Sequence, residues 1–158
     1  MPGFASTPRF LLRLMHFPPR AAYALGLGPL IGRLVLLLTT TGRKSGKARV
    51  TPLQYEIIAG EVYLGAAFGQ RADWLRNLQV NPRVELRVKA RRTAGTARIV
   101  ADTGQIADYL AVRLQRHPKI VSAMLRGDGL REPFQRADLE QYARQIRLAV
   151  ITPDHPLD

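Results

Sequence analysis

Residues 83–89 (RVELRVK) carry the strongest structural pattern in the sequence, a strict alternation of apolar and charged side chains. Val84, Leu86 and Val88 fall on one face, and the other face carries only charged residues. This alternation is typical of an antiparallel strand with one face on a core and the other in water. Residues 93–100 are its expected partner strand, with Gly95 as an expected bulge.

Further short strands and helices are predicted around this pair. The strands are expected at residues 35–41, 50–58, 61–68 and 148–152, and Ala59-Gly60 predicts a hairpin turn between the second and third of them. Helices are expected at residues 73–78, 103–117, 120–125 and 137–146, with Asp102 and Gln105 marking a helix start. Strands that outnumber and precede most helices favour an α+β fold, a small antiparallel β-barrel with flanking helices, over a parallel sheet.

The chain length fits one domain, residues 1–158, with an N-terminal amphipathic helical segment at 1–32 and a C-terminal helical region at 103–147. Residues 7–17 read as a short amphipathic helix. The apolar run 21–38 just reaches the length of a membrane span, but its glycines and Pro29 favour a helix, a turn and a buried strand. We expect a cytoplasmic protein, with peripheral contact to the inner face of the cell membrane through this basic, apolar N-terminus.

The charge of the chain is far from balanced. Twenty-four Lys and Arg residues against twelve Asp and Glu residues give a net charge of +12. Such an excess attracts anionic partners, so nucleic acid, an anionic membrane surface and a phosphate-bearing small molecule all remain open. The absence of cysteine excludes disulfides, cysteine nucleophiles and thiolate metal sites.

The positive charge is densest in residues 36–52 (LLLTTTGRKSGKARVTP), a strand, a glycine-containing loop and a second strand. Pro52 indicates that the second strand lies at a sheet edge or a kink. The loop is not a nucleotide-triphosphatase P-loop, because only three residues separate its glycines and Ala48 follows the lysine. Glycine amides, Lys, Arg and Ser together suit an anion site, and a solvated basic turn is the alternative.

Few side chains suit covalent or metal chemistry. His16, His117 and His155 have no metal-ligand spacing, and each is interpreted as an ordinary surface or terminal residue. No nucleophile motif is present. The small residues at 65–69 would allow a ligand to approach the backbone closely. This composition favours a reaction in which a bound cofactor performs the difficult step.

The segment TTTGRKSG, followed by Asp73-Trp74-Leu75-Arg76-Asn77-Leu78 and Asn81-Pro82, resembles the deazaflavin-dependent nitroreductase and quinone reductase family. The resemblance runs from about Arg9 to Val100. It implies a split β-barrel similar to flavin-reductase and pyridoxamine-oxidase barrels, and a homodimer. It also implies coenzyme factor 420, an 8-hydroxy-5-deazaflavin with a phosphate and an acidic polyglutamate tail. The implied reaction is hydride transfer to a nitroaromatic, quinone or similar small-molecule acceptor.

The resemblance also implies a cofactor site, in which Lys44 and Arg49 contact the phosphate. The residues implied to bind the cofactor are Arg43, Lys44, Ser45, Arg49, Val50, Thr51, Pro52, Leu53, Gln54, Gly65, Ala66, Ala67, Phe68, Asp73, Trp74, Leu75, Arg76 and Asn77. The best-known branch of the family has a lysine where this chain has Phe68, and Arg71 is the candidate replacement. The proton donor and other catalytic residues stay unassigned, and no metal is expected.

Two alternatives remain open at this point. The same barrel could bind FMN, the less favoured cofactor, or haem. A non-enzymatic basic module for membranes or nucleic acid would also use the charge, but recognisable nucleic-acid-binding motifs are absent, so nucleic acid is not an expected partner.

Overall fold

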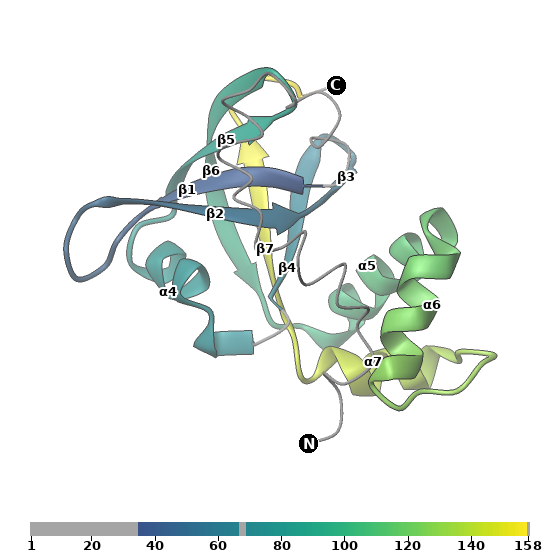
Figure 1. The fold of residues 1–158 in the computed structure, drawn as a ribbon. Helices are drawn as coiled ribbons and strands as arrows, with labels where there is room; N and C mark the ends of the chain where they lie inside the picture. The colour runs from purple at the N-terminus through teal and green to yellow at the C-terminus, as the bar shows by residue number, and fades with distance from the viewer. Residues whose placement is uncertain (1–34, 67–68, 158) are drawn as a thin grey trace.

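A curled antiparallel sheet forms the centre of the computed structural model, which describes residues 35–66 and 69–157 (Figure 1). Its seven strands run in the order β2-β1-β5-β6-β7-β4-β3, and every neighbouring pair is antiparallel. The strands are β1 (Val35–Thr41), β2 (Ala48–Gln54), β3 (Glu56–Ile58), β4 (Glu61–Ala66), β5 (Arg83–Val88), β6 (Arg91–Val100) and β7 (Arg147–Pro153). The sequence prediction of a small antiparallel barrel with flanking helices is thereby confirmed.

The strand predicted at residues 50–58 is in fact two strands. β2 ends at Gln54 and β3 begins at Glu56, so Tyr55 alone joins them, although they lie at opposite ends of the sheet order. Among the described strands, β2 pairs only with β1, and β3 pairs only with β4. The chain therefore crosses from one edge of the curled sheet to the other at Tyr55. Pro52 lies on β2, which is an edge strand of the described sheet, as predicted.

The interior of the barrel is an apolar core. Alternate residues of β1, Leu36 and Leu38, are fully buried there, as is Leu86 of β5. The short helix α4 (Asp73–Val80) follows the 3-10 turn Gly69–Arg71 and ends at Asn81 before Pro82, as predicted. It packs Trp74, Leu75 and Leu78 against this core, which fixes the helix beneath β1 and β2 (Figure 1).

A second core lies on the other face of β7, under the remaining helices, which are α5 (Thr103–Arg116), α6 (Pro118–Gly127) and α7 (Arg136–Ala143). Leu148 and Val150 of β7 contribute to it, while Ala149 and Ile151 point into the barrel. The Asp102 carboxylate accepts a hydrogen bond from the Gln105 amide at 2.8 Å, so the predicted helix start is confirmed. β7 was expected only as a last strand, but it lies between β6 and β4, where it separates the two cores.

Strands β5 and β6 confirm the alternation prediction, since Val84, Leu86 and Val88 are all buried. The bulge expected at Gly95 is wrong, because the pairing of β5 with β6 runs through Val84 and Gly95 without an extra residue. Gly95 is instead required by close packing. A Cβ there would lie 2.7 Å from Ile151 Cγ2 and 2.9 Å from the Thr152 carbonyl oxygen on β7.

Replacing Gly95 with alanine is expected to lower the free energy of unfolding by about 1–3 kcal/mol, the usual cost of overpacking a filled core. The neighbouring atoms include backbone of β7, which cannot rotate away. Gly127→Ala is the matched control, because nothing lies within 4 Å of a Cβ there. Urea denaturation of both variants measures the difference, and a Gly95→Ala protein as stable as the control would contradict the packing explanation.

The predicted N-terminal segment 1–32 lies outside the described residues, and so does its expected membrane contact. Among the helices that the structure describes, none has both the length and the apolar character that a membrane crossing requires. The division of the whole chain into one domain with this extension stays a prediction.

Candidate functional site

The basic loop between β1 and β2 is closed by its own hydrogen bonds. The Gly42 amide donates to the Lys47 carbonyl and the Gly46 amide to the Gly42 carbonyl, both at 2.8 Å. A Cβ on Gly42 would lie 2.9 Å from Ser45 Oγ, and Gly46 has a φ of +67°, which favours glycine. The expectation that the glycine amides face an anion is therefore corrected: they hold the turn together, and the loop offers an anion mainly its side chains.

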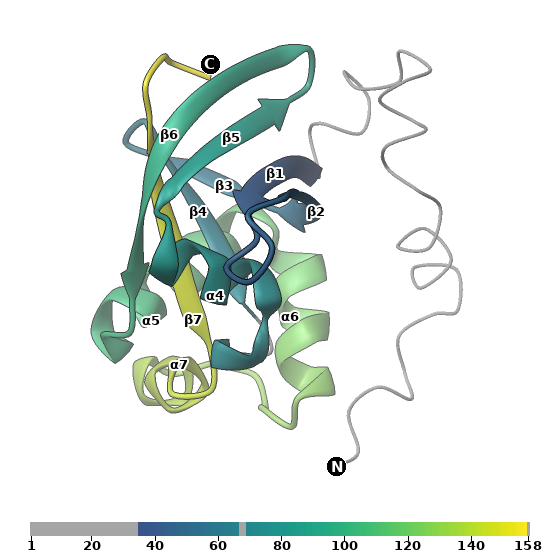
Figure 2. The ribbon, with the colours of Figure 1, turned by 90° about the vertical axis from the view of Figure 1, so that its left-hand side faces the viewer.

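Arg43 joins this loop to helix α4. Its backbone amide donates to Asn77 Oδ1 at 3.1 Å, and its guanidinium donates to the same oxygen at 3.1 Å. The guanidinium also donates to the Asp73 carboxylate at 2.9 Å. Figure 2 shows the loop beside α4. The guanidinium of Arg43 is thus engaged by partners within the protein, so its charge is less available to a ligand.

Asp73 does not cap helix α4. The N-cap is Ala72, and Asp73 lies in the first turn, where its carboxylate faces Arg43. The hydrogen bond from Arg43 and the guanidinium charge hold the pKa of Asp73 below its ordinary value. Because the pKa of Asp73 is lower in the folded state, the pair contributes its full stability at pH values above the ordinary pKa of aspartate. This stability is lost only as the pH falls through the lower, folded-state pKa. The pair is therefore intact at neutral pH.

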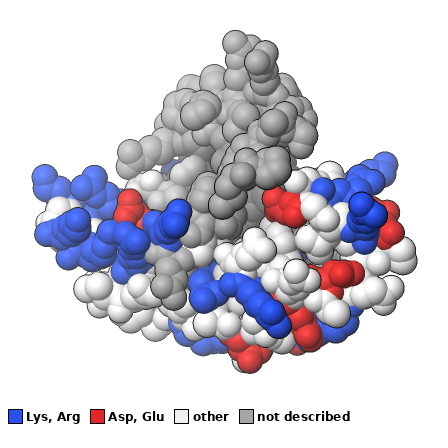
Figure 3. All heavy atoms as spheres, turned by 90° about the horizontal axis from the view of Figure 1, so that it is seen from below, with Lys and Arg blue, Asp and Glu red and all other residues white. Residues whose placement is uncertain are grey.

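Three other cations of the loop segment are open to solvent. Lys44, Lys47 and Arg49 are exposed and make no ion pair within the described part of the chain. Arg49 lies directly opposite Thr40 in the register of β1 and β2, so its side chain leaves the sheet on the face toward α4. In Figure 3 blue side chains crowd the left edge of the molecule, where Figure 1 places the loop. This edge is an electropositive surface beside the helix.

A groove of about 580 Å³ runs between the loop, β2 and α4. This volume lies in the range of small-molecule sites. Trp74 forms a wall of it with only 8% of its surface exposed, and Val50 and Thr51 line the strand side. Unpaired cations at the mouth and an indole on the wall suit a ligand with an anionic group and a flat ring. The groove is lined by Gly42, Arg43, Lys44, Ser45, Ala48, Arg49, Val50, Thr51, Asp73, Trp74 and Asn77.

Half of the residues that the sequence implied for the cofactor meet in this groove, namely Arg43, Lys44, Ser45, Arg49, Val50, Thr51, Asp73, Trp74 and Asn77. Those that do not line it are Pro52, Leu53, Gln54, Gly65, Ala66, Leu75 and Arg76. Leu75 is fully buried in the barrel core, and Gly65 faces the Tyr109 hydroxyl, 3.5 Å from where a Cβ would lie. Ala67 and Phe68 lie outside the described residues. Arg71 is exposed and does not line the groove.

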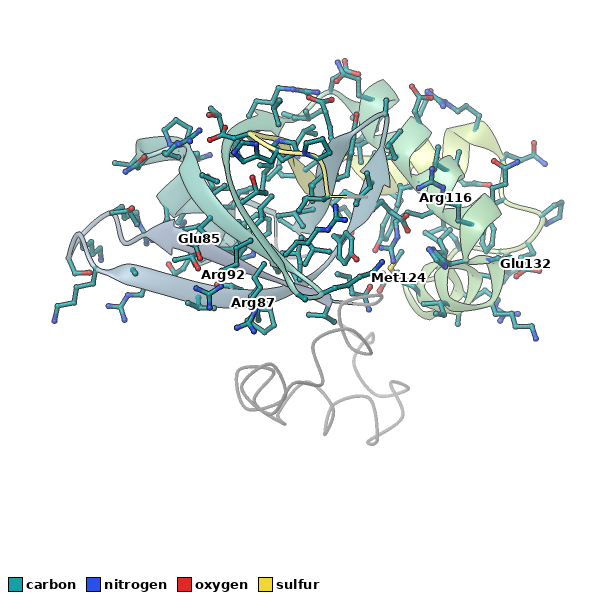
Figure 4. All side chains as sticks on the ribbon, turned by 90° about the horizontal axis from the view of Figure 1, so that it is seen from above. Glu85, Arg87, Arg92, Arg116, Met124 and Glu132 are labelled. Atoms are coloured by element: carbon teal, nitrogen blue, oxygen red, sulfur yellow. The ribbon has the colours of Figure 1, made fainter. Side chains whose placement is uncertain are left out.

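Two further hollows differ in character from this groove. One, of about 250 Å³, lies on the outer face of the sheet, where Figure 4 shows Glu85 beside Arg87 and Arg92. Another, of about 470 Å³, lies beside α7 and includes Asp128, which accepts a 2.7 Å hydrogen bond from the Tyr142 hydroxyl. The loop groove has three cations, Arg43, Lys44 and Arg49, against one carboxylate, Asp73, whereas each of the other hollows has a less positive balance of charge. The loop groove is therefore the better candidate site for an anionic ligand.

Sequence reasoning missed Thr40 and Glu56. Thr40 is buried and accepts a hydrogen bond from Asn77 Nδ2 at 3.1 Å, and its place in the threonine run beside the loop was the only signal. Glu56 is buried beneath Arg113, Arg116 and His117. The interpretation of His117 as an ordinary surface residue is incomplete, because its Nε2 lies 2.9 Å from Glu56 Oε1. These partners are about sixty residues from Glu56 in the sequence, so no local sequence pattern predicts these contacts.

The fold defines the class of the protein. Solved structures with this architecture include a conserved hypothetical protein from Mycobacterium tuberculosis, at 16% identity and a TM-score of 0.56, covering 82% of this chain and 79% of that one. The heme storage protein HutZ from Vibrio cholerae matches at 19% identity and a TM-score of 0.54, covering 78% and 83%. An F420-H2 dependent reductase, FDR-A, matches at 22% identity and a TM-score of 0.51, covering 75% and 94%. At these identities the similarity shows the split-barrel fold alone.

The sequence specifies the family. Residues 21–123 match the family described as F420H2-dependent quinone reductase, which is more than half of the chain and includes the loop, β2 and α4. The chain belongs to this family. It is therefore an oxidoreductase that uses coenzyme F420, the cofactor that the sequence motifs implied.

Proposed function

We propose that the chain transfers a hydride from reduced F420 to a quinone, with nitroaromatic compounds as a second class of acceptor. Bound reduced F420 supplies two electrons and a proton as hydride, and reduction of a quinone to the hydroquinone takes one further proton. The observation that carries the proposal is the groove, because it joins unpaired cations to an aromatic wall. The family description favours the quinone over the nitroaromatic acceptor.

In this proposal different residues of the groove bind different parts of the cofactor. Lys44 and Arg49 bind the phosphate, since both are exposed cations at the groove with no ion pair among the described residues. Charged donors make the stronger hydrogen bonds to phosphate oxygens. The ring system would lie against the part of the groove that Val50, Thr51 and Trp74 line. Pro52, Leu53, Gln54, Gly65 and Arg76 of the sequence-derived set would lie along the cofactor beyond the groove. Ala66 and Leu75 are buried in the barrel core and do not reach it.

Assembly and location are also part of the proposal. A solved structure described as a domain-swapped dimer shares the fold at 21% identity and a TM-score of 0.54, over 92% of this chain. It supports a homodimer, which light scattering of the purified protein would test. Peripheral membrane contact through residues 1–32 rests on their basic and apolar sequence. Co-sedimentation with anionic vesicles would test it, and a protein that stays in the supernatant would contradict it.

The decisive experiment for the function is a titration of the purified protein with F420. Trp74 is the only tryptophan of the chain, so its fluorescence reports on the groove directly. We expect saturable quenching at micromolar cofactor, and oxidation of reduced F420 when a quinone is added. Saturable binding of FMN with no response to F420 would instead favour the flavin alternative.

Lys44→Ala is expected to weaken F420 binding by about 1–3 kcal/mol, because a charged donor to the phosphate is lost. Lys47→Ala is the matched control, since Lys47 belongs to the same loop and carries the same charge but does not line the groove. Dissociation constants from fluorescence titration measure both effects. Equal affinities of the two variants would show that the side chain of Lys44 faces solvent when the cofactor is bound.

A further inference from the structure

Asn77 of α4 connects this helix to the end of β1 and the start of the basic loop, which lie 34 to 37 residues earlier in the sequence. Its Oδ1 accepts hydrogen bonds from the backbone amide and the guanidinium of Arg43, each at 3.1 Å. Its Nδ2 donates to Thr40 Oγ1, also at 3.1 Å. Asn77 is 4% exposed and Thr40 is 1% exposed. A buried amide with both ends engaged holds one orientation, because leaving either end unpaired would cost free energy.

Both contacts lie at the start of the basic loop, and the pairing of β1 with β2 links one of them to the end of the loop. Arg43 immediately precedes Lys44, so the bonds of its backbone amide and its guanidinium to Asn77 together fix the chain beside this lysine. Thr40 lies opposite Arg49 across the β1–β2 pair, so the bond to Asn77 also holds the strand that carries Arg49 against α4. The two exposed cations of the groove are therefore positioned from the same buried side chain.

The salt bridge of Arg43 with Asp73 is a weaker part of this arrangement. Its carboxylate side chain is 80% exposed, whereas the Arg43 side chain is 22% exposed. Exposed ion pairs contribute little to stability, because water and salt screen the two charges. The buried contacts of Asn77 therefore carry most of the connection between loop and helix.

We propose that Asn77 is a positioning residue that holds Lys44 and Arg49 in place for the phosphate of the cofactor, and that Arg43 serves as its partner rather than as a phosphate ligand. This inference rests on the proposed function, in which the loop binds the phosphate. It assigns to Asn77 and Arg43 a role that differs from direct cofactor contact, although both line the groove. Recognition of the phosphate then depends on a side chain that never touches it.

The test compares two ligands, F420 and an 8-hydroxy-5-deazaflavin that lacks the phosphate and the tail. Asn77→Leu and Arg43→Met are each expected to raise the dissociation constant of F420 about 10-fold, the size of one lost charged hydrogen bond. Neither is expected to change the dissociation constant of the phosphate-free ligand by more than about 2-fold. An equal loss of affinity for both ligands would mean general damage to the groove and would overturn the proposal.

The double variant Arg43→Met/Asn77→Leu separates positioning from direct contact. Residues that act through one shared contact are not additive, so the double variant is expected to bind F420 no more weakly than the weaker single variant. If the dissociation constant of the double variant rises by the product of the two single-variant increases, Arg43 and Asn77 act on the ligand independently and the proposal fails. Hydrogen exchange adds a second readout. In both single variants the amides of residues 43–46 are expected to exchange faster in the free protein, while α4 stays protected.

Asn77→Leu could fail to fold, because it leaves the Thr40 hydroxyl buried without its partner. Arg43→Met then decides alone, since Arg43 lies near the surface. Weaker F420 binding with faster loop exchange supports the proposal, and weaker binding with unchanged exchange identifies Arg43 as a ligand and overturns it. Lys44→Ala shows whether the proposed function fails rather than the positioning role. If this variant binds F420 as tightly as the wild-type protein does, the loop does not hold the phosphate. If Lys44→Ala weakens binding but Arg43→Met does not, the positioning role alone is wrong.

Discussion

Replacing Glu56 with alanine is expected to lower the free energy of unfolding by about 3 kcal/mol. Only 6% of the Glu56 side chain is exposed, and its carboxylate lies 3.1 Å from an Arg116 nitrogen and 3.5 Å from Arg113 Nε. Breaking a buried ion pair by removing one partner typically costs about 3–5 kcal/mol, because the other charge stays buried and unpaired. The lower end applies, since Arg116 and His117 are nearly half exposed and can regain water.

Arg116→Met is the matched control for this cluster. It removes a partner that is 44% exposed, so we expect a loss of less than about 1 kcal/mol. Figure 4 shows Arg116 between the strands and the helices, which is the boundary that Glu56 ties together. Urea denaturation followed by circular dichroism measures both variants. A Glu56→Ala protein that loses no more stability than the control would show that water already reaches the carboxylate.

Trp74→Ala should cost about 3–5 kcal/mol of stability, the usual range for removing a buried tryptophan. Trp74 is 8% exposed and packs in the barrel core with Leu75 and Leu78. Val80→Ala on the same helix is the control, because Val80 is 67% exposed and its loss should change stability by less than about 0.5 kcal/mol. A loss below about 1 kcal/mol for Trp74→Ala would contradict its place in the core.

Trp74→Ala also tests the proposed cofactor site, because Trp74 belongs to the barrel core and also forms a wall of the groove. Trp74→Phe keeps an apolar ring there and should retain most of the stability. Equilibrium dialysis can follow F420 binding in variants that lack the indole fluorescence. We expect weaker binding to Trp74→Ala than to Trp74→Phe at a temperature where both are folded, and equal binding would remove Trp74 from the proposed site.

The fold was largely predictable because its signals are local. The alternation at residues 83–89 and the stop at Asn81-Pro82 each depend on neighbours in the sequence, and both strand and helix are present as predicted. Gly95 shows the limit of such signals. Glycine in a strand indicates either a bulge or a close approach, and only the position of β7 decides between them.

The division of the 50–58 run at Tyr55 shows the same limit for topology. Both halves have the composition of a strand, so nothing local marks the break. The break exists because β2 must pair with β1 while β3 pairs with β4 at the other end of the sheet. Closure of a curled sheet is a property of the whole set of strands, and a window of a few residues does not contain it.

For the basic loop, the sequence by itself determined the charge, the turn and, through its resemblance to a family, the cofactor. The tertiary structure alone decided which of those charges are available. Arg43 and Lys44 are adjacent and equally cationic, yet the guanidinium of Arg43 is held by Asn77 and Asp73 while Lys44 stays without an ion pair among the described residues. The physical reason is distance: the partners of Arg43 lie 30 and 34 residues away in the sequence, and only folding brings them within 3.1 Å.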